Sequence, residues 1–261
     1  MSTPSGPNPA KVALSILKAR RMRRPHPRGS GEVDHSALAA VLVALADGGV
    51  AILPEHRDAL DQYRRQLEVV DPDSLNRDGA LAFWINLYNA GALDVAAEAA
   101  ASGESTVLRV AGGFRAPWAA VAGEELSLDA IEHGKIRRFG DPRIHGGLVC
   151  GSASCPTLRY EPFTADDLDR QLDDQMRSFL AGDGAAQDVT ANQLRLSRVF
   201  LWYGADFTRP HRMPTVLPSR KTTIADALGR WLSPALEEWR IAAGPSIAFQ
   251  PYDWSLACSI R

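Results

Sequence analysis

The sequence predicts a mixed α/β protein of the α+β class, rich in helix, with a small central, mostly antiparallel sheet in a single domain. Three observations favour this class. Apolar residues recur at helical spacing through most of the chain, apolar runs of strand length are few, and no repeat or interior linker divides residues 31–261. The chain of 261 residues is 45% hydrophobic and 23% charged, which is typical of a globular protein that buries a sizeable core.

Helical periodicity is clearest in the first half of the chain. Apolar residues three and four apart predict a helix from about Leu38 that ends at Gly48 and Gly49, and a more polar helix is expected over residues 57–69. The strongest pattern covers residues 79–101. Its first three turns are apolar nearly all round, which is typical of a helix buried on every side.

Two asparagines, Asn86 and Asn89, interrupt this apolar helix three residues apart and share one face of it. A buried side-chain amide costs a few kcal/mol, on the order of 2–7, unless it is hydrogen-bonded. Two interpretations stay open. The amides tie neighbouring loops to the helix, or one of them orients a catalytic group or a ligand.

The second half of the chain alternates helices with short strands. Ser127 is a typical N-cap for a helix through about Phe139, with Glu132 on it. Residues 144–150 are expected to form a short apolar strand, residues 151–156 a loop, and residues 194–197 another strand. Further helices are expected over residues 168–179, 199–203, 222–232 and 234–242.

Residues 1–30 form a basic segment whose only charged side chains are lysines and arginines, so the rest of the chain is acidic. Several prolines and few apolar residues predict a disordered tail. The alternative is that the tail attracts an acidic or anionic partner. Nucleic acid is not expected as a partner, because the acidic body would oppose its approach.

Targeting and redox features favour a cytoplasmic protein. The basic stretch is separated from the apolar run near Ala37 by Glu32 and Asp34, which is not the layout of a secretory signal. No stretch approaches about 18 uninterrupted apolar residues, so no integral membrane segment is expected. Three cysteines are too few for a disulfide scaffold, which fits a reducing compartment.

Cys150 is the leading candidate for chemistry, because it lies where an apolar run meets a loop of small residues. A thiol acts as a nucleophile only as the thiolate, so it needs a nearby histidine or cation. His133 and His145 are the candidates. In a regular strand His145 and Cys150 would point to opposite faces unless Gly146 and Gly147 host a bulge, so His133 is the preferred partner.

Other interpretations of the same residues are retained. Together with Cys155, the two histidines and Cys150 supply four ligands of the zinc type, although their spacing is poor for a metal site. Cys150 and Cys155 could instead form a reversible disulfide. His133 could simply pair with Asp129. No phosphate loop or dinucleotide motif is present, so no cofactor is expected, with zinc as the alternative.

Several strings in order resemble the domain of unknown function 547 family. They are residues 83–90 (FWINLYNA), 131–133 (IEH), 141–145 (DPRIH), 148–156 (LVCGSASCP), 202–207 (WYGADF) and 251–256 (PYDWSL). Members of this family occur in bacteria and plants and have no assigned function. The resemblance therefore implies positions rather than a reaction, namely Asn86, Asn89, Glu132, His133, His145 and Cys150.

The leading hypothesis from the sequence is a cysteine-dependent hydrolase or acyl transferase. Cys150 is its nucleophile, His133 its general base with His145 in reserve, and Asn86 or Asn89 its orienting or oxyanion-binding amide. The alternative is a non-catalytic module that binds a small molecule, a peptide or another protein. In that case Trp118, Trp202 and Tyr203 would line the binding surface.

Overall fold

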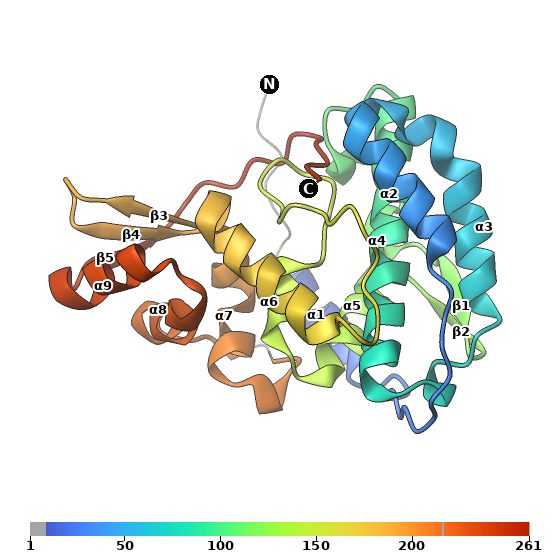
Figure 1. The fold of residues 1–261 in the computed structure, drawn as a ribbon, viewed down its shortest axis with the longest axis horizontal. Helices are drawn as coiled ribbons and strands as arrows, with labels where there is room; N and C mark the ends of the chain where they lie inside the picture. The colour runs from blue at the N-terminus through green and yellow to red at the C-terminus, as the bar shows by residue number, and fades with distance from the viewer. Residues whose placement is uncertain (1–8, 216, 261) are drawn as a thin grey trace.

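The computed structural model describes residues 9–215 and 217–260 and confirms a helix-rich α+β protein with small sheets (Figure 1). The described helices are α1 (Pro9–Ala19), α2 (Ser36–Gly48), α3 (Arg57–Glu68), α4 (Arg77–Ala101), α5 (Leu128–Gly134), α6 (Leu168–Phe179), α7 (Arg198–Thr208), α8 (Lys221–Leu228) and α9 (Pro234–Ala243). The strands are β1 (Ala119–Val121), β2 (Glu124–Leu126), β3 (Ala185–Asp188), β4 (Gln193–Leu196) and β5 (Ser246–Phe249).

Helix α4 is the centre of the larger of two apolar cores, which it shares with α2, α3 and α5. The side chain of Asn76 caps the helix by accepting a hydrogen bond from the Gly79 N–H at 2.7 Å. Every residue from 80 to 93 is buried, as the all-round apolar pattern predicts. In Figure 1, α2 and α3 run along the outer side of α4.

A second core lies at the other end of the molecule, where α6, α7 and α8 pack with the sheet of β3, β4 and β5 (Figure 1). Phe179 of α6, Phe200 and Phe207 of α7, and Leu196 of β4 are among its buried residues. The ring of Phe200 contacts those of Phe179 and Phe207 at centroid distances of 5.5 and 5.4 Å. The chain thus folds around two adjoining cores.

The sheets are mostly antiparallel but lie at the margins of the fold, whereas a central sheet was expected. Strands β1 and β2 form an antiparallel pair, and β4 pairs antiparallel with β3 and parallel with β5. Strand β4 lies where residues 194–197 were predicted to form a strand. The apolar helix α4 takes the central position that the sequence analysis gave to a sheet.

The strand predicted over residues 144–150 is wrong. The segment begins as a 3-10 helix, Pro142–Gly146, in which the Ile144 carbonyl accepts hydrogen bonds from the Gly147 and Leu148 N–H groups at 2.8 and 2.9 Å. The backbone from Gly147 onward is then bonded by the side chain of Asn89 rather than by a neighbouring strand. The apolar composition of residues 144–150 gave no indication that Asn89, rather than a neighbouring strand, would bond this backbone.

The helix predicted from Ser127 to Phe139 has the expected start but is interrupted. Ser127 caps α5 by accepting a hydrogen bond from the Ala130 N–H at 3.1 Å. At Lys135 the backbone leaves the helical geometry, with φ −119° and ψ −71°, and a 3-10 helix covers Ile136–Phe139. The interruption sets the direction of the side chain of Arg137.

The segment before residue 30, predicted to be a disordered tail, contains helix α1 over Pro9–Ala19, while residues 1–8 lie outside the described structure. Ile16 and Ala19 are 5% and 2% exposed, so this helix packs against the domain. The carbonyl of Ala19 also accepts a hydrogen bond from Arg138 at 2.6 Å. Two apolar anchors and one charge-assisted hydrogen bond offset the high charge of the segment.

By length and composition alone, the consecutive helical residues of Ser36–Glu68 include a window apolar enough to cross a membrane, which was not expected. This is weak evidence for a span. Leu38 and Leu45 of this stretch are 1% and 0% exposed because they pack into the larger core, and the later part carries the ion-paired Arg57 and Arg64.

Gly91 lets α5 approach α4 closely, because a Cβ at this position would lie 2.9 Å from Trp118 Cε3 and closer still to the Leu128 side chain. Replacing an exposed glycine in a helix by alanine usually raises the free energy of unfolding by about 1 kcal/mol. We expect the opposite sign for Gly91→Ala, a loss of about 1–3 kcal/mol through overpacking. Urea unfolding measures the change, and a stabilised variant would contradict this packing.

Candidate functional site

A cavity of about 390 Å³ opens where the two cores adjoin. Four residues singled out in the sequence line it, namely Glu132, His133, His145 and Cys150. They come from α5, the 3-10 helix Pro142–Gly146 and the loop after it. Aromatic rings form much of the remaining wall, contributed by Tyr88, Phe114, Trp202, Tyr203, Tyr252 and Trp254.

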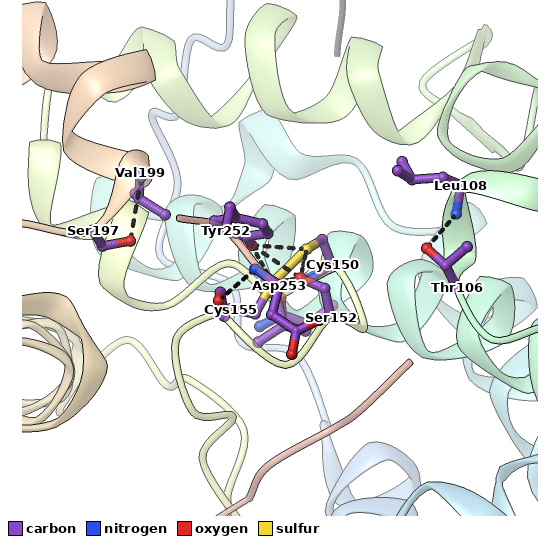
Figure 2. Close-up of a disulfide and its surroundings, with 12 residues drawn as sticks. Thr106, Leu108, Cys150, Ser152, Cys155, Ser197, Val199, Tyr252 and Asp253 are labelled. Carbon is purple, nitrogen blue, oxygen red and sulfur yellow. Dashed lines mark hydrogen bonds between the residues drawn. A yellow bond between two sulfur atoms is a disulfide. The ribbon is translucent and has the colours of Figure 1, made fainter. Parts of the chain in front are cut away.

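Cys150 and Cys155, both on the cavity wall, are joined by a disulfide (Figure 2). Two hydroxyl groups surround the sulfurs. Ser152 Oγ lies 3.0 Å from Cys150 Sγ and donates to the Tyr252 hydroxyl at 3.0 Å, and that hydroxyl lies 3.3 Å from Cys155 Sγ. Burial raises the pKa of Tyr252 to about 12, although the hydrogen bond from Ser152 opposes the shift, so the phenol remains a donor at neutral pH.

The segment near the C-terminus holds the cysteine loop in place. The Ala153 N–H donates to the Ser255 carbonyl at 2.9 Å, and the Asp253 N–H donates to Ser154 Oγ, also at 2.9 Å. Gly151 has φ +75°, and a Cβ there would lie 3.0 Å from Val107 Cγ1. Only glycine fits this close turn without strain.

His145 is held in the wall by a carboxylate that the sequence analysis did not select. Its Nε2 lies 2.9 Å from Asp206 Oδ2, and its ring stacks on Tyr203 with centroids 4.1 Å apart. Arg137 donates two hydrogen bonds to Asp206 at 2.8 and 2.9 Å, and both partners are at most 1% exposed. Asp206 therefore fixes the imidazole and leaves Nδ1 as the ring nitrogen available for chemistry.

The protonation states of this cluster follow from burial and neighbouring charge. Burial lowers the pKa of His145, against the opposing effect of Asp206. Burial alone would raise the pKa of Asp206, but hydrogen bonds and charge from His145 and Arg137 outweigh it and lower the pKa to about 2. A neutral imidazole beside an ionised carboxylate is the state of a general base.

Glu132 and His133 form a second carboxylate and imidazole pair in the same cavity. Glu132 Oε1 lies 3.3 Å from His133 Nδ1, and that nitrogen also lies 3.4 Å from an Arg137 nitrogen. Burial would raise the pKa of Glu132, yet the charges of His133, His145 and Arg137 bring it to about 2. His133 is 4% exposed and contacts Glu132 rather than pairing in solvent with Asp129.

Asn86 and Asn89 do not line the cavity, because their amides bond to backbone elsewhere. Asn86 donates to the Phe163 carbonyl at 2.8 Å and accepts from its N–H at 2.9 Å. Asn89 does the same for the Gly147 carbonyl and the Val149 N–H, at 3.0 and 3.1 Å. The interpretation that they tie loops to the helix matches this geometry, and an oxyanion role does not.

The structure also shows how the histidines lie relative to the cysteine sulfurs, which aromatic residues line the cavity, and whether the possible metal ligands are grouped. In the part of the chain that the structure describes, neither histidine makes a hydrogen bond to a cysteine sulfur. Trp202 and Tyr203 line the cavity, whereas Trp118 donates to Asp94 at 3.2 Å. Across residues 9–215 and 217–260, no three His, Cys, Asp or Glu residues are grouped to hold a metal ion.

A known protein family matches the part of the chain that supplies most of the cavity wall. Residues 72–180 match the family model described as protein of unknown function, DUF547. The resemblance inferred from the sequence is thereby confirmed. The matched DUF547 region contains Glu132, His133, His145 and both cysteines of the disulfide, whereas Asp206, Tyr203 and Tyr252 lie beyond it. No curated protein and no solved structure matches the chain.

Asp206, Arg137 and Tyr252 are the site residues that sequence reasoning missed. A signal existed for Asp206, because it is the one acid in the otherwise apolar and aromatic string at residues 202–207. Buried acids are rarely left unpaired. Its partner Arg137 was 69 residues away, and no local spacing connects the two.

The structural role of Asn86 predicts a stability effect. Asn86→Ala would leave the Phe163 N–H and carbonyl buried without partners, so we expect the free energy of unfolding to fall by about 1–3 kcal/mol. Denaturant unfolding by circular dichroism measures it. Gln187→Ala, at an exposed position of β3, is the comparison, and an equally small effect at both positions would contradict the role.

The lowered pKa values predict acid sensitivity of the site. The unfolded chain binds a proton at Glu132 near pH 4.5, whereas the folded chain does so near 2. The stabilisation is present above 4.5 and is lost as the pH falls toward 2. Glu132→Gln should therefore show a shallower decline of unfolding free energy over this range than the unchanged protein. Identical slopes would contradict the shift.

Proposed function

We propose that the cavity is the active site of a cysteine-dependent hydrolase or acyl transferase, with Cys150 as nucleophile once its disulfide to Cys155 is reduced. The observation that supports this most is the Asp206–His145 pair in the same wall as Cys150. His145 replaces His133 as the preferred base. Asp206 takes the orienting role first given to the asparagines, which is the logic of a nucleophile, a base and a carboxylate.

The reaction begins with reduction. A dithiol delivers two electrons and two protons to the disulfide, which leaves thiols on Cys150 and Cys155 and oxidises the dithiol. His145 Nδ1 then takes the Cys150 proton, and the sulfur attacks the substrate carbonyl carbon. The leaving group departs with the proton from His145. Water, or a second acceptor, attacks the resulting thioester and restores the thiol.

The surroundings of the sulfurs support a thiolate in this position. The Tyr252 hydroxyl lies 3.5 Å from Cys150 Sγ, and Ser152 Oγ lies 3.0 Å from it. Hydrogen bonds to the anionic form of an acidic group such as a thiol lower its pKa. In the cytoplasm, where we propose that the protein works, the glutathione pool would supply the reducing condition that this chemistry needs.

A binding module without catalysis is the second candidate, and the aromatic wall favours it. Trp202, Tyr252 and Trp254 contact one another with ring centroids 4.5 to 5.7 Å apart and together line one side of the cavity. Aromatic walls with a few polar groups are typical of small-molecule pockets. The two candidates differ in whether Cys150 is reactive.

The pH dependence of Cys150 alkylation distinguishes the enzyme from the binding module. In a Cys155→Ser, Cys258→Ser background, Cys150 is the remaining cysteine. We expect its reaction with iodoacetamide to titrate at least about one pH unit below the free thiol value of about 8.5, because His145 and the hydroxyl groups stabilise the thiolate. Adding His145→Gln, which keeps a donor for Asp206, should move the midpoint toward 8.5.

His133→Gln in the same background is the matched control, and we expect it to move the alkylation midpoint less than His145→Gln does. Reduced protein mixed with p-nitrophenyl acetate should release a burst of nitrophenol, which Cys150→Ser removes. A midpoint at or above about 8.5 without a burst would reject the thiol chemistry and leave the binding module.

A further inference from the structure

The geometry points to a substrate class for this cavity: an acyl compound that carries an organic ammonium group, bound against the carboxylate of Glu132. This inference rests on the function proposed above and deepens it. The two carboxylate oxygens of Glu132 have different surroundings, because one of them has a hydrogen-bond partner and the other has none among the described residues.

Glu132 Oε1 has no hydrogen-bond partner within the described part of the chain, although Glu132 lies on the cavity wall and is 7% exposed. His133 Nδ1 lies 3.3 Å away outside hydrogen-bond geometry, and the Tyr203 side chain also interacts with this carboxylate. The other oxygen, Oε2, lies 3.5 Å from the Tyr88 hydroxyl. A buried acceptor without a partner is costly, so a ligand that donates to Oε1 would be favoured.

The charges around Glu132 determine which kind of hydrogen-bond donor a ligand would bring to Oε1. Glu132 and Asp206 are two ionised carboxylates of one buried cluster, whose guanidinium, on Arg137, makes its two short hydrogen bonds to Asp206. Burial keeps His145 neutral at pH 7. Arg137 is thus hydrogen-bonded to Asp206 rather than to Glu132, and an ammonium ion in the cavity would be attracted to the second carboxylate, that of Glu132.

Other ionisable groups of the wall are paired elsewhere or neutral. Asp129 and Arg115 also line the cavity, and their side chains pair with each other at 3.8 Å rather than with Glu132. Burial raises the pKa of Tyr88 and of Tyr203 well above 10, so both remain neutral.

Aromatic rings beside the carboxylate favour an organic cation over a neutral donor. Tyr88 and Phe114 line the same cavity, with their ring centroids 6.3 Å apart. The faces of such rings attract a cation through the negative charge of their π electrons. Substrates of this class are esters or amides with an amino group near the acyl carbon and an apolar or aromatic body.

Three probes of one shape test the charge preference on the oxidised protein, in which the disulfide blocks thiol chemistry. They are benzylamine, benzyl alcohol and phenylacetate, followed through the fluorescence of Trp202 and Trp254 in the wall. We expect benzylamine to bind at least about tenfold more tightly than benzyl alcohol, and phenylacetate not to bind. Glu132→Gln should abolish the preference for benzylamine.

Glu125→Gln, an exposed acid on β2, is the matched control and should keep the preference. Equal affinity for benzylamine and benzyl alcohol, tighter binding of phenylacetate, or no benzylamine binding up to about 10 mM would each overturn the inference. If Glu132→Gln does not fold, the ranking of the three probes on the unchanged protein still decides it. Because none of the three probes carries an acyl group with a leaving group, none can acylate a thiol, and this result is independent of the alkylation experiment.

Discussion

The buried ion pair between Arg137 and Asp206 is the interaction on which the site depends. It joins a 3-10 helix of the first half of the fold to α7 of the second, with both partners out of solvent. Removing one partner of such a pair typically costs about 3–5 kcal/mol, because the other charge is left buried. The bidentate geometry also fixes the direction of Asp206, and Asp206 in turn fixes His145. One interaction thus closes the junction of the two cores and sets the geometry of the cavity.

The interruption of the helix after α5 explains how Arg137 reaches its partner. A continuous helix from Ser127 to Phe139 would place Arg137 one turn after His133 on the same face, with Glu132 about 100° around the helix from His133. Because the backbone departs at Lys135, the guanidinium turns toward α7, while Glu132 and His133 stay on the cavity wall. Arg137 and Glu132 both contact His133. The short segment from Glu132 to Arg137 therefore contributes to the junction of the two cores and also to the cavity wall.

How far the sequence predicted this structure depended on the range of the interactions involved. Helices α2, α3 and α4 and the capping residue Ser127 followed from periodicity and local chemistry. The strand predicted over residues 144–150 failed because Asn89, nearly sixty residues earlier, supplies the hydrogen bonds. Asp206 was missed for the same reason, since its partners lie 61 and 69 residues away. Glu132, His133, His145 and Cys150 do share a cavity, but their roles are not fixed by that proximity.

The N-terminal segment shows how a charged stretch can belong to a fold. Composition predicts disorder when there is too little apolar surface to offset the lost chain entropy. In α1, however, Ile16 and Ala19 are buried against the domain, and Ser15 reaches the cavity wall and hydrogen-bonds Asp129. These contacts place α1 in the wall of the cavity although the segment is rich in charge, because a few well-placed apolar side chains and a hydrogen bond to the Ala19 carbonyl anchor the helix to the domain.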